Sequence, residues 1–265
     1  MSKNMFFNLF HTIPLYTIFI FTFLSLFLAF KGGVFLGKKH QLIAEPKDRS
    51  PINSIVAATL GLLAFLLAFT FGIAASKFDE RRTLVVEEAN AIRTTYLRAD
   101  YLPELHRNEI KNLLKEYISV RIASLSPKNF DQTIKKSEDL QDKLWLQTVT
   151  VAEKNPNSVI VGLFIESLNE LISLHAKRLN IGIRIRIPFI IWCVLYFVTI
   201  LAIGSVGYQI GLINARYLGI NALLILIFST VIVLIADLDR PQEGFIKVSQ
   251  QSLIDLIDKF NKHEN

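Results

Sequence analysis

Cysteine is nearly absent from this chain of 265 residues, and charge is absent from four long stretches of it. A single cysteine, Cys193, excludes an intramolecular disulfide and a metal cluster built from several thiolates. The five histidines form no pair at metal-ligand spacing, and the sequence contains no HExxH, GxSxG, P-loop or GxGxxG pattern. We therefore expect neither an enzyme nor a resident cofactor.

The four stretches that lack Asp, Glu, Lys and Arg cover residues 13–30, 52–75, 187–208 and 218–236. A helix needs roughly 20 residues to cross about 30 Å of hydrocarbon. Hydrophobic residues make up 51% of the chain and its mean hydropathy is +0.39, which disfavours a soluble protein. The sequence predicts an all-α, polytopic membrane protein with four transmembrane helices and membrane lipid around them.

Four spans place both termini and the long segment 76–186 on one side of the membrane. Near the spans, that side carries ten basic residues and the other side six, which favours a cytoplasmic location for the segment. We expect a cell membrane location, with both termini cytoplasmic. Basic residues at membrane boundaries account for the net charge of +6, so no nucleic-acid partner is expected. The juxtamembrane bases that we single out are Lys77, Arg81, Arg82, Arg184 and Arg186.

The segment 76–186 has few helix breakers, and its prolines at 103, 127 and 156 separate the helices that we expect. No breaker separates Ser76 from the membrane span before it, so we predict one long helix over residues 52–100 that leaves the membrane. The last helix, 159–186, is expected to lead into the third span, with a kink or cap at Pro188. The predicted helices of the segment cover residues 76–102, 104–124, 129–154 and 157–186.

We expect five regions along the chain. They are an N-terminal region with the first span and a basic loop (1–51), the second span (52–75), a helical cytoplasmic domain (76–186), a hairpin of the third and fourth spans (187–236) and a cytoplasmic tail (237–265). An apolar stripe in the first cytoplasmic helix predicts packing in a bundle or an oligomer, and the tail contains a short amphipathic stretch. The stripe comprises Phe78, Val85, Ala89, Ile92 and Tyr96; the tail stretch comprises Leu253, Ile254, Leu256, Ile257 and Phe260.

Small residues at helical spacing give the second span a surface that permits close contact with another helix. Phe65 and Phe69 lie one turn apart near the middle of this span. Facing the axis of an oligomer, they would form a ring that constricts a pore and gates it by dewetting. Facing lipid or a neighbouring helix is the alternative. The small residues are Ala57, Ala58, Gly61, Ala64, Ala68 and Gly72.

Two further features concern the third and fourth spans. A GxxxG pattern at Gly207 and Gly211 predicts close packing of the third span on the fourth. Asp237 and Asp239 lie at the C-terminal end of the fourth span, where the helix dipole disfavours negative charge by up to about 1 kcal/mol. Arg240 or the juxtamembrane bases could offset this cost, or Asp237, Asp239 and Glu243 could bind a divalent cation.

Two stretches of the sequence resemble the bestrophin-like membrane proteins of bacteria. The first runs Ser76-Lys77-Phe78-Asp79-Glu80-Arg81-Arg82 and continues through Glu88-Ala89-Asn90-Ala91-Ile92 to Tyr96-Leu97-Arg98. The second is Asp237-Leu238-Asp239-Arg240-Pro241, followed by Gly244 and Val248-Ser249-Gln250-Gln251. The resemblance covers nearly the whole chain and implies a location in the inner membrane of a bacterium.

That family is named for a more distant likeness to bestrophins, which are pentameric chloride channels whose second span lines the pore. The resemblance implies a neck that includes Phe65 and Phe69, while Gly61 stands where a bulky residue is expected and shifts the neck toward Ile73. Bestrophins bind calcium through a dense acidic cluster after the fourth span. This chain has only Asp237, Asp239 and Glu243 there, so calcium gating is not expected.

The function implied is a homo-oligomeric, pentameric ion channel that conducts anions through a hydrophobic neck. The segment 76–186 has 18 basic and 15 acidic residues, and this net charge of +3 favours neither sign of ion strongly. The alternative is a membrane-anchored helical scaffold or regulator that binds a cytoplasmic partner and conducts nothing.

Overall fold

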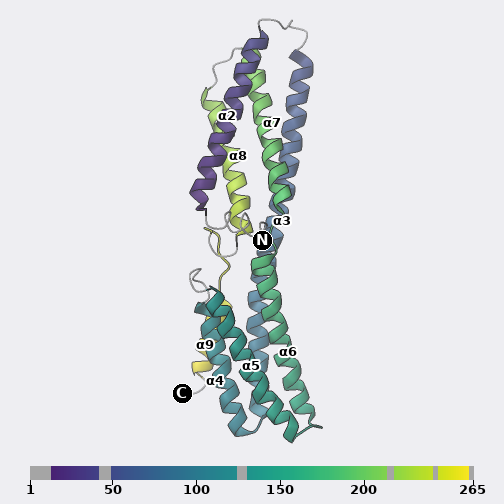
Figure 1. Ribbon diagram of the computed structural model, residues 1–265, viewed down its shortest axis with the longest axis vertical. Helices are drawn as coiled ribbons and strands as arrows, with labels where there is room; N and C mark the ends of the chain where they lie inside the picture. Colours follow the sequence, from purple (N-terminus) through teal and green to yellow (C-terminus); the bar gives the residue numbers. More distant parts are fainter. Residues whose placement is uncertain (1–12, 42–48, 124–129, 214–217, 241–243, 263–265) are drawn as a thin grey trace. The chain divides into compact units, whose positions relative to one another are not determined.

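The computed structural model describes residues 13–41, 49–123, 130–213, 218–240 and 244–262. Within these ranges every regular element is a helix, which confirms the all-α prediction (Figure 1). The chain divides into two compact units: the first comprises residues 1–77 and 186–240, and the second comprises residues 78–185 and 241–265.

The first unit contains α2 (Leu15–Gln41), the first part of α3 (Arg49–Arg98), α7 (Phe189–Ile213) and α8 (Leu218–Asp239). Its helices pack through aliphatic and aromatic side chains of the predicted spans. The buried members of this core are Leu26, Phe30, Val56, Ile203, Val206 and Ile225.

Glycines bring α2 and α7 into backbone contact. A Cβ added at Gly33 would clash with the carbonyl oxygen of Gly204, and one added at Gly207 would clash with that of Phe30. Gly211 likewise lies against Gly37. The prediction that this GxxxG pattern packs on the fourth span is therefore wrong, because its surface is covered by α2.

Helix α3 is a single helix of 50 residues, which confirms the long rod predicted for residues 52–100. Pro51 lies in its first turn, where the missing N–H has no helical partner to lose. A short 3₁₀ turn, Ala99–Tyr101, ends the rod before Pro103.

Of the two alternatives predicted for the junction at Pro188, the structure has a cap and not a kink in a continuous helix. Helix α6 (Val159–Leu179) continues only as a π-helical turn, Asn180–Arg184, and residues 185–188 are not helical. Pro188 has no N–H to extend the preceding helix, and its carbonyl oxygen instead accepts from the N–H of Ile191 at 2.9 Å, at the start of α7.

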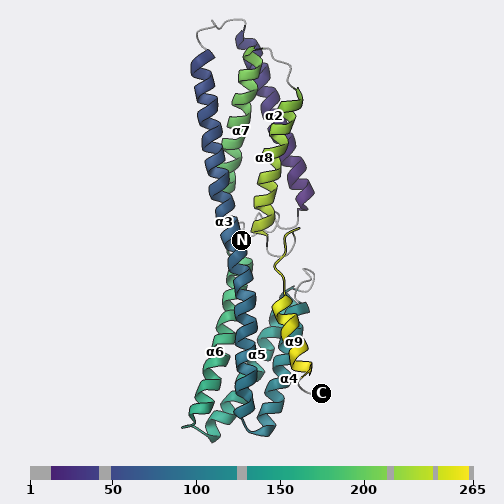
Figure 2. The same ribbon diagram turned by 180° about the vertical axis from the view of Figure 1, so that it is seen from behind.

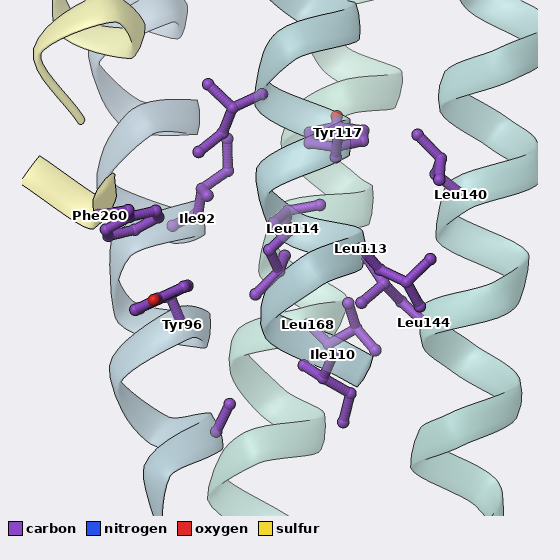
Figure 3. Close-up of a cluster of buried hydrophobic side chains, with 14 of the residues drawn as sticks. Ile92, Tyr96, Ile110, Leu113, Leu114, Tyr117, Leu140, Leu144, Leu168 and Phe260 are labelled. Carbon is purple, nitrogen blue, oxygen red and sulfur yellow. The ribbon is translucent and has the colours of Figure 1, made fainter. Parts of the chain in front are cut away.

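The second unit is a helical bundle of the later part of α3, α4 (Glu104–Ala123), α5 (Phe130–Lys154), α6 and α9 (Gln251–Lys262). Four of the five stripe residues predicted on α3, all but Phe78, are buried here, so this stripe packs within the chain. The Tyr96 and Phe260 rings stack with centroids 3.7 Å apart, which joins α9 to α3 (Figure 3). Figure 2 shows α9 beside α4.

Five helical stretches in the described ranges are long and apolar enough to cross a membrane, so the number of spans stays a prediction. Four of them overlap the predicted spans. The fifth includes α6, whose buried face joins the core of the second unit and whose outer face carries Glu166 and Glu170. We therefore assign α6 to the helical domain. The five stretches are Leu15–His40, Pro51–Tyr101, Val159–Gly182, Phe189–Ile213 and Asn221–Asp239.

Candidate functional site: the outer face of α3 and a buried charge cluster

Phe65 and Phe69 lie one turn apart on the membrane part of α3, with ring centroids 6.4 Å apart. Their side chains are 65% and 57% exposed, so they turn away from the interior of their own chain. The opposite face of the helix is buried. Its buried residues are Val56, Leu63, Leu67, Thr70 and Ala74.

The small residues predicted for this span all lie on its exposed surface, together with the two phenylalanines. A Cβ added at Gly61 or at Gly72 would meet no atom within 4 Å. Their small size is therefore not required by packing within this chain. Ile73 is half-buried and lies beside this face. We call the exposed surface around Phe65 and Phe69 the outer face of α3.

A cavity of about 200 Å³ borders the outer face where α3 meets α7. Its only hydroxyl belongs to Thr70, and this group donates to the carbonyl oxygen of Leu66 at 2.7 Å. The cavity walls are therefore apolar, and the Phe69 ring has space to move. The lining residues are Leu66, Phe69, Thr70, Ile190, Ile191, Val194 and Leu195.

Asp237 and Asp239 are buried at the end of α8. The Asp239 carboxylate accepts a hydrogen bond from the N–H of Ile187 at 3.0 Å, and the Asp239 carbonyl oxygen accepts one from Arg186. Through these two hydrogen bonds, Asp239 connects the non-helical segment before α7 to the end of α8. This arrangement favours the salt-bridge and hydrogen-bond alternative over a bound cation.

The other residues of that acidic segment do not form a metal site in the described part of the chain. Arg240 donates to the carbonyl oxygen of Ile13 at 2.7 Å, and Glu243 lies outside the described residues. Among the described residues, no group of three His, Cys, Asp or Glu side chains could hold a metal ion.

The predicted juxtamembrane bases divide between the two units of the chain. Lys77 and Arg186 belong to the first unit, whereas Arg81, which is buried, and Arg82, which is exposed, belong to the second. The side chain of Arg184 lies outside the described part of the structure.

A buried charge cluster inside the second unit escaped the sequence analysis. Glu88 on α3 is completely buried and accepts from Arg121 Nε of α4 at 2.9 Å and from Arg178 Nη1 of α6. Tyr117 donates its hydroxyl proton to the Glu88 carboxylate at 2.8 Å. One carboxylate therefore ties three helices together.

Two further side chains extend this network. The hydroxyl of Tyr117 lies 3.0 Å from Nδ1 of His175 and accepts from Nε2 of Gln141 at 3.3 Å. Because the hydroxyl proton is donated to Glu88, Nδ1 of His175 must carry a proton. Its Nε2 is buried and has no hydrogen-bond partner among the described residues. The contacts thus favour a neutral His175.

The pKa values of the cluster follow from burial and charge. Burial alone would raise the pKa of Glu88, but Arg121 and Arg178 outweigh it and lower this pKa to about 2. Burial, and then repulsion by Arg121, lower the pKa of His175 to about 4. At neutral pH the cluster therefore holds a charged Glu88 and a neutral His175.

A sequence signal for the cluster was present. Glu88 lies three residues after Val85 and four before Ile92, so it interrupts the apolar stripe that we used to predict packing. Arg121 lies likewise four residues after Tyr117 on the buried face of α4. A charged residue on an apolar face indicates a buried ion pair, but its partner cannot be identified without tertiary contacts.

Comparison with known proteins gives the family and the fold. The family model described as Bestrophin-like domain matches residues 24–253. No curated protein matches the sequence. The chain resembles the crystal structure of a bacterial bestrophin homologue from Klebsiella pneumoniae with a TM-score of 0.63 and 16% identity, covering 92% of this chain and 96% of that one. It also resembles a crystal structure described only as a membrane protein, with a TM-score of 0.65 and 15% identity over 93% of this chain and 96% of that one.

These likenesses show that the chain has the fold of the bacterial bestrophin homologue, and they confirm the predicted bestrophin-like architecture. The match to the family model extends from the first apolar helix into α9, so it spans both units. The chain is a membrane protein that belongs to the bestrophin-like family.

Proposed function

We propose that this chain is one subunit of a homo-oligomeric ion channel whose pore is lined by the outer face of α3. The observation that carries the proposal is the orientation of Phe65 and Phe69: they are exposed on the chain itself, while the opposite face of the helix is buried. In a ring of subunits, these side chains would meet around the axis.

A ring of phenylalanines excludes water from a narrow pore and gates ions by dewetting. The narrowest level that we propose is that of Phe65 and Phe69, which lie among the small residues of this face. The apolar cavity beside Phe69 provides space into which the ring can move when the constriction widens. Following the resemblance to bestrophins, we propose a pentamer that conducts anions.

The decisive experiment measures conductance in planar bilayers for the wild-type protein and for the double variant Phe65→Ala, Phe69→Ala. Widening the constriction should raise the open probability or the conductance several-fold. The matched control is the double variant Phe35→Ala, Phe197→Ala, because these phenylalanines of α2 and α7 are 69% and 62% exposed. The control should conduct like the wild type.

The same recordings test the ion and the assembly. An anion channel shifts its reversal potential toward the chloride equilibrium potential in a salt gradient. Two results together would refute the channel. Neither the wild type nor the double variant would conduct under varied voltage and tension, and images of the purified particles would show no central axis lined by α3. A membrane-anchored scaffold would then be the better description.

A further inference from the structure

The contacts of the buried charge cluster reach beyond the four long helices of the second unit. Arg178 donates one N–H to Glu88 and another to Oε1 of Gln250 at 2.5 Å. Gln250 directly precedes α9 and is itself buried. The C-terminal segment is therefore attached to the charge cluster through one guanidinium group.

His175 lies one turn before Arg178 on α6 and shares the same surroundings. Adding a proton to Nε2 of His175 would create a buried N–H with no acceptor among the described residues. It would also add a cation beside two guanidinium groups. The folded arrangement therefore resists this proton, whereas a rearrangement that relieves the crowding would accept it.

We propose that the cluster is an acid-sensitive latch that releases the Gln250 end of α9 from Arg178 when His175 becomes protonated. An imidazolium beside Tyr117 can take over part of the role of Arg178 as a counter-charge for Glu88. Arg178 can then turn away from the cluster, and its hydrogen bond to Gln250 is lost. The loss of this hydrogen bond should weaken the attachment of α9, a helix of 12 residues that is shorter than its neighbours.

Every element that packs around the imidazole contributes to this response. The charged or titratable groups near it are Glu88 on α3, Tyr117 and Arg121 on α4, and Arg178 on α6; Gln141 on α5 and Gln250 before α9 are neutral. Glu88 keeps its charge above a pH of about 2, and the pKa of about 4 keeps His175 neutral in the closed cluster, so in mildly acidic solution only a released imidazole takes up a proton.

Hydrogen exchange of the full-length protein in detergent tests the latch. With a pKa of about 4 for the closed state and 6.5 for a released imidazole, the opening equilibrium of α9 should rise by up to roughly 30-fold between pH 7.5 and pH 5.0. Protection factors of residues 251–262, corrected for the intrinsic exchange rate, should fall by that ratio. Unchanged protection would overturn the proposal.

Two variants and one control identify the responsible group. His175→Gln should abolish the pH dependence of α9 protection, and Gln250→Glu should suppress acid release by pairing with Arg178. The control His106→Gln alters another buried histidine of α4, bonded to Gln147 at 2.8 Å, and should respond to pH like the wild type. The latch would be refuted if α9 protection in His175→Gln kept its full dependence on pH. If His175→Gln does not fold, the same result in Gln250→Glu would refute it. The readout is protection of a helix, so it does not depend on whether the protein conducts ions.

Discussion

A completely buried carboxylate such as that of Glu88 is stable only while its counter-charges and hydrogen-bond donors stay in place. Arg121, Arg178 and Tyr117 provide them from α4 and α6. The charge of Glu88 can therefore be buried only when α3, α4 and α6 pack correctly against one another. At the residue scale, the packing of the second unit depends on the Glu88 carboxylate.

Neutralising that anion should destabilise the bundle. Glu88→Gln leaves two buried guanidinium groups without the carboxylate that both contact, and breaking a buried ion pair costs about 3–5 kcal/mol. Denaturant unfolding in detergent, followed by circular dichroism, measures the loss. The neighbouring Glu87→Gln is the matched control because Glu87 is partly exposed, and it should change stability by less than about 0.5 kcal/mol. Equal effects of the two variants would contradict the role of Glu88.

Acid should weaken the folded chain through two groups of the same cluster. The pKa of His175 is about 4 in the folded chain and 6.5 in the unfolded one, so the unfolded chain binds more protons and stability falls as the pH is lowered from 6.5 to 4. Glu88 extends the loss from pH 4.5 down to about 2. Protonation of His175 should lower the free energy of unfolding by roughly 3 kcal/mol over this pH range.

Unfolding free energies of wild type and His175→Gln, measured across this pH range, give the contribution of the imidazole. The variant should lose the slope between pH 6.5 and pH 4 and should keep the further loss below pH 4.5. A variant that follows the wild-type curve throughout would show that other groups cause the acid sensitivity.

At the scale of elements, the pairing of α2 with α7 depends on glycines rather than on large side chains. Their backbones approach so closely that the Cα–H groups of one helix face carbonyl oxygens of the other. In lipid, such approach gains packing contacts that the hydrophobic effect cannot supply, because the acyl chains are equally apolar. Short side chains are thus the requirement at this interface.

Adjacent glycines in α2 allow a matched test of this interface. Gly33→Ala places a methyl group against the Gly204 backbone and should separate the helices, at a cost of about 1–3 kcal/mol. Gly32→Ala meets no atom within 4 Å and should change stability by less than about 1 kcal/mol. Thermal unfolding in detergent compares them. Comparable melting temperatures for the two variants would contradict close packing at Gly33.

At the scale of the whole molecule, the outer face of α3 raises the question of what surrounds it in the membrane. A pore exposes this face to water, whereas a lone subunit would expose it to acyl chains. Accessibility to a charged reagent distinguishes the two because such a reagent does not partition into hydrocarbon.

Cysteine labelling provides this measurement. In a Cys193→Ser background, Phe69→Cys should react with a membrane-impermeant thiol reagent at least about tenfold faster than Phe197→Cys on α7, because only a thiolate in contact with water is reactive. The native cysteine is exposed and must be removed first. Equal, slow labelling at both positions would place α3 in lipid and remove the basis of the proposed pore.

Local patterns were sufficient for most helices of the described residues. Uncharged runs of about 20 residues predict membrane helices because the bilayer length and the cost of burying charge leave little alternative. Prolines predict where α4 and α5 begin or end because a residue before proline disfavours helical geometry. The rod of α3 and the stripe of Val85, Ala89, Ile92 and Tyr96 follow from the same local rules.

Contacts between segments far apart in the sequence were decided only by the tertiary structure. A GxxxG pattern specifies close approach but not its partner, which is why α7 packs on α2 and not on the helix expected from chain order. Glu88, Arg121, Arg178 and Gln250 come from four separate segments, and no spacing rule relates them. The sequence by itself determined which stretches form long apolar helices, because that depends on local composition; folding determined which buried charges meet, because that depends on the packing of whole helices.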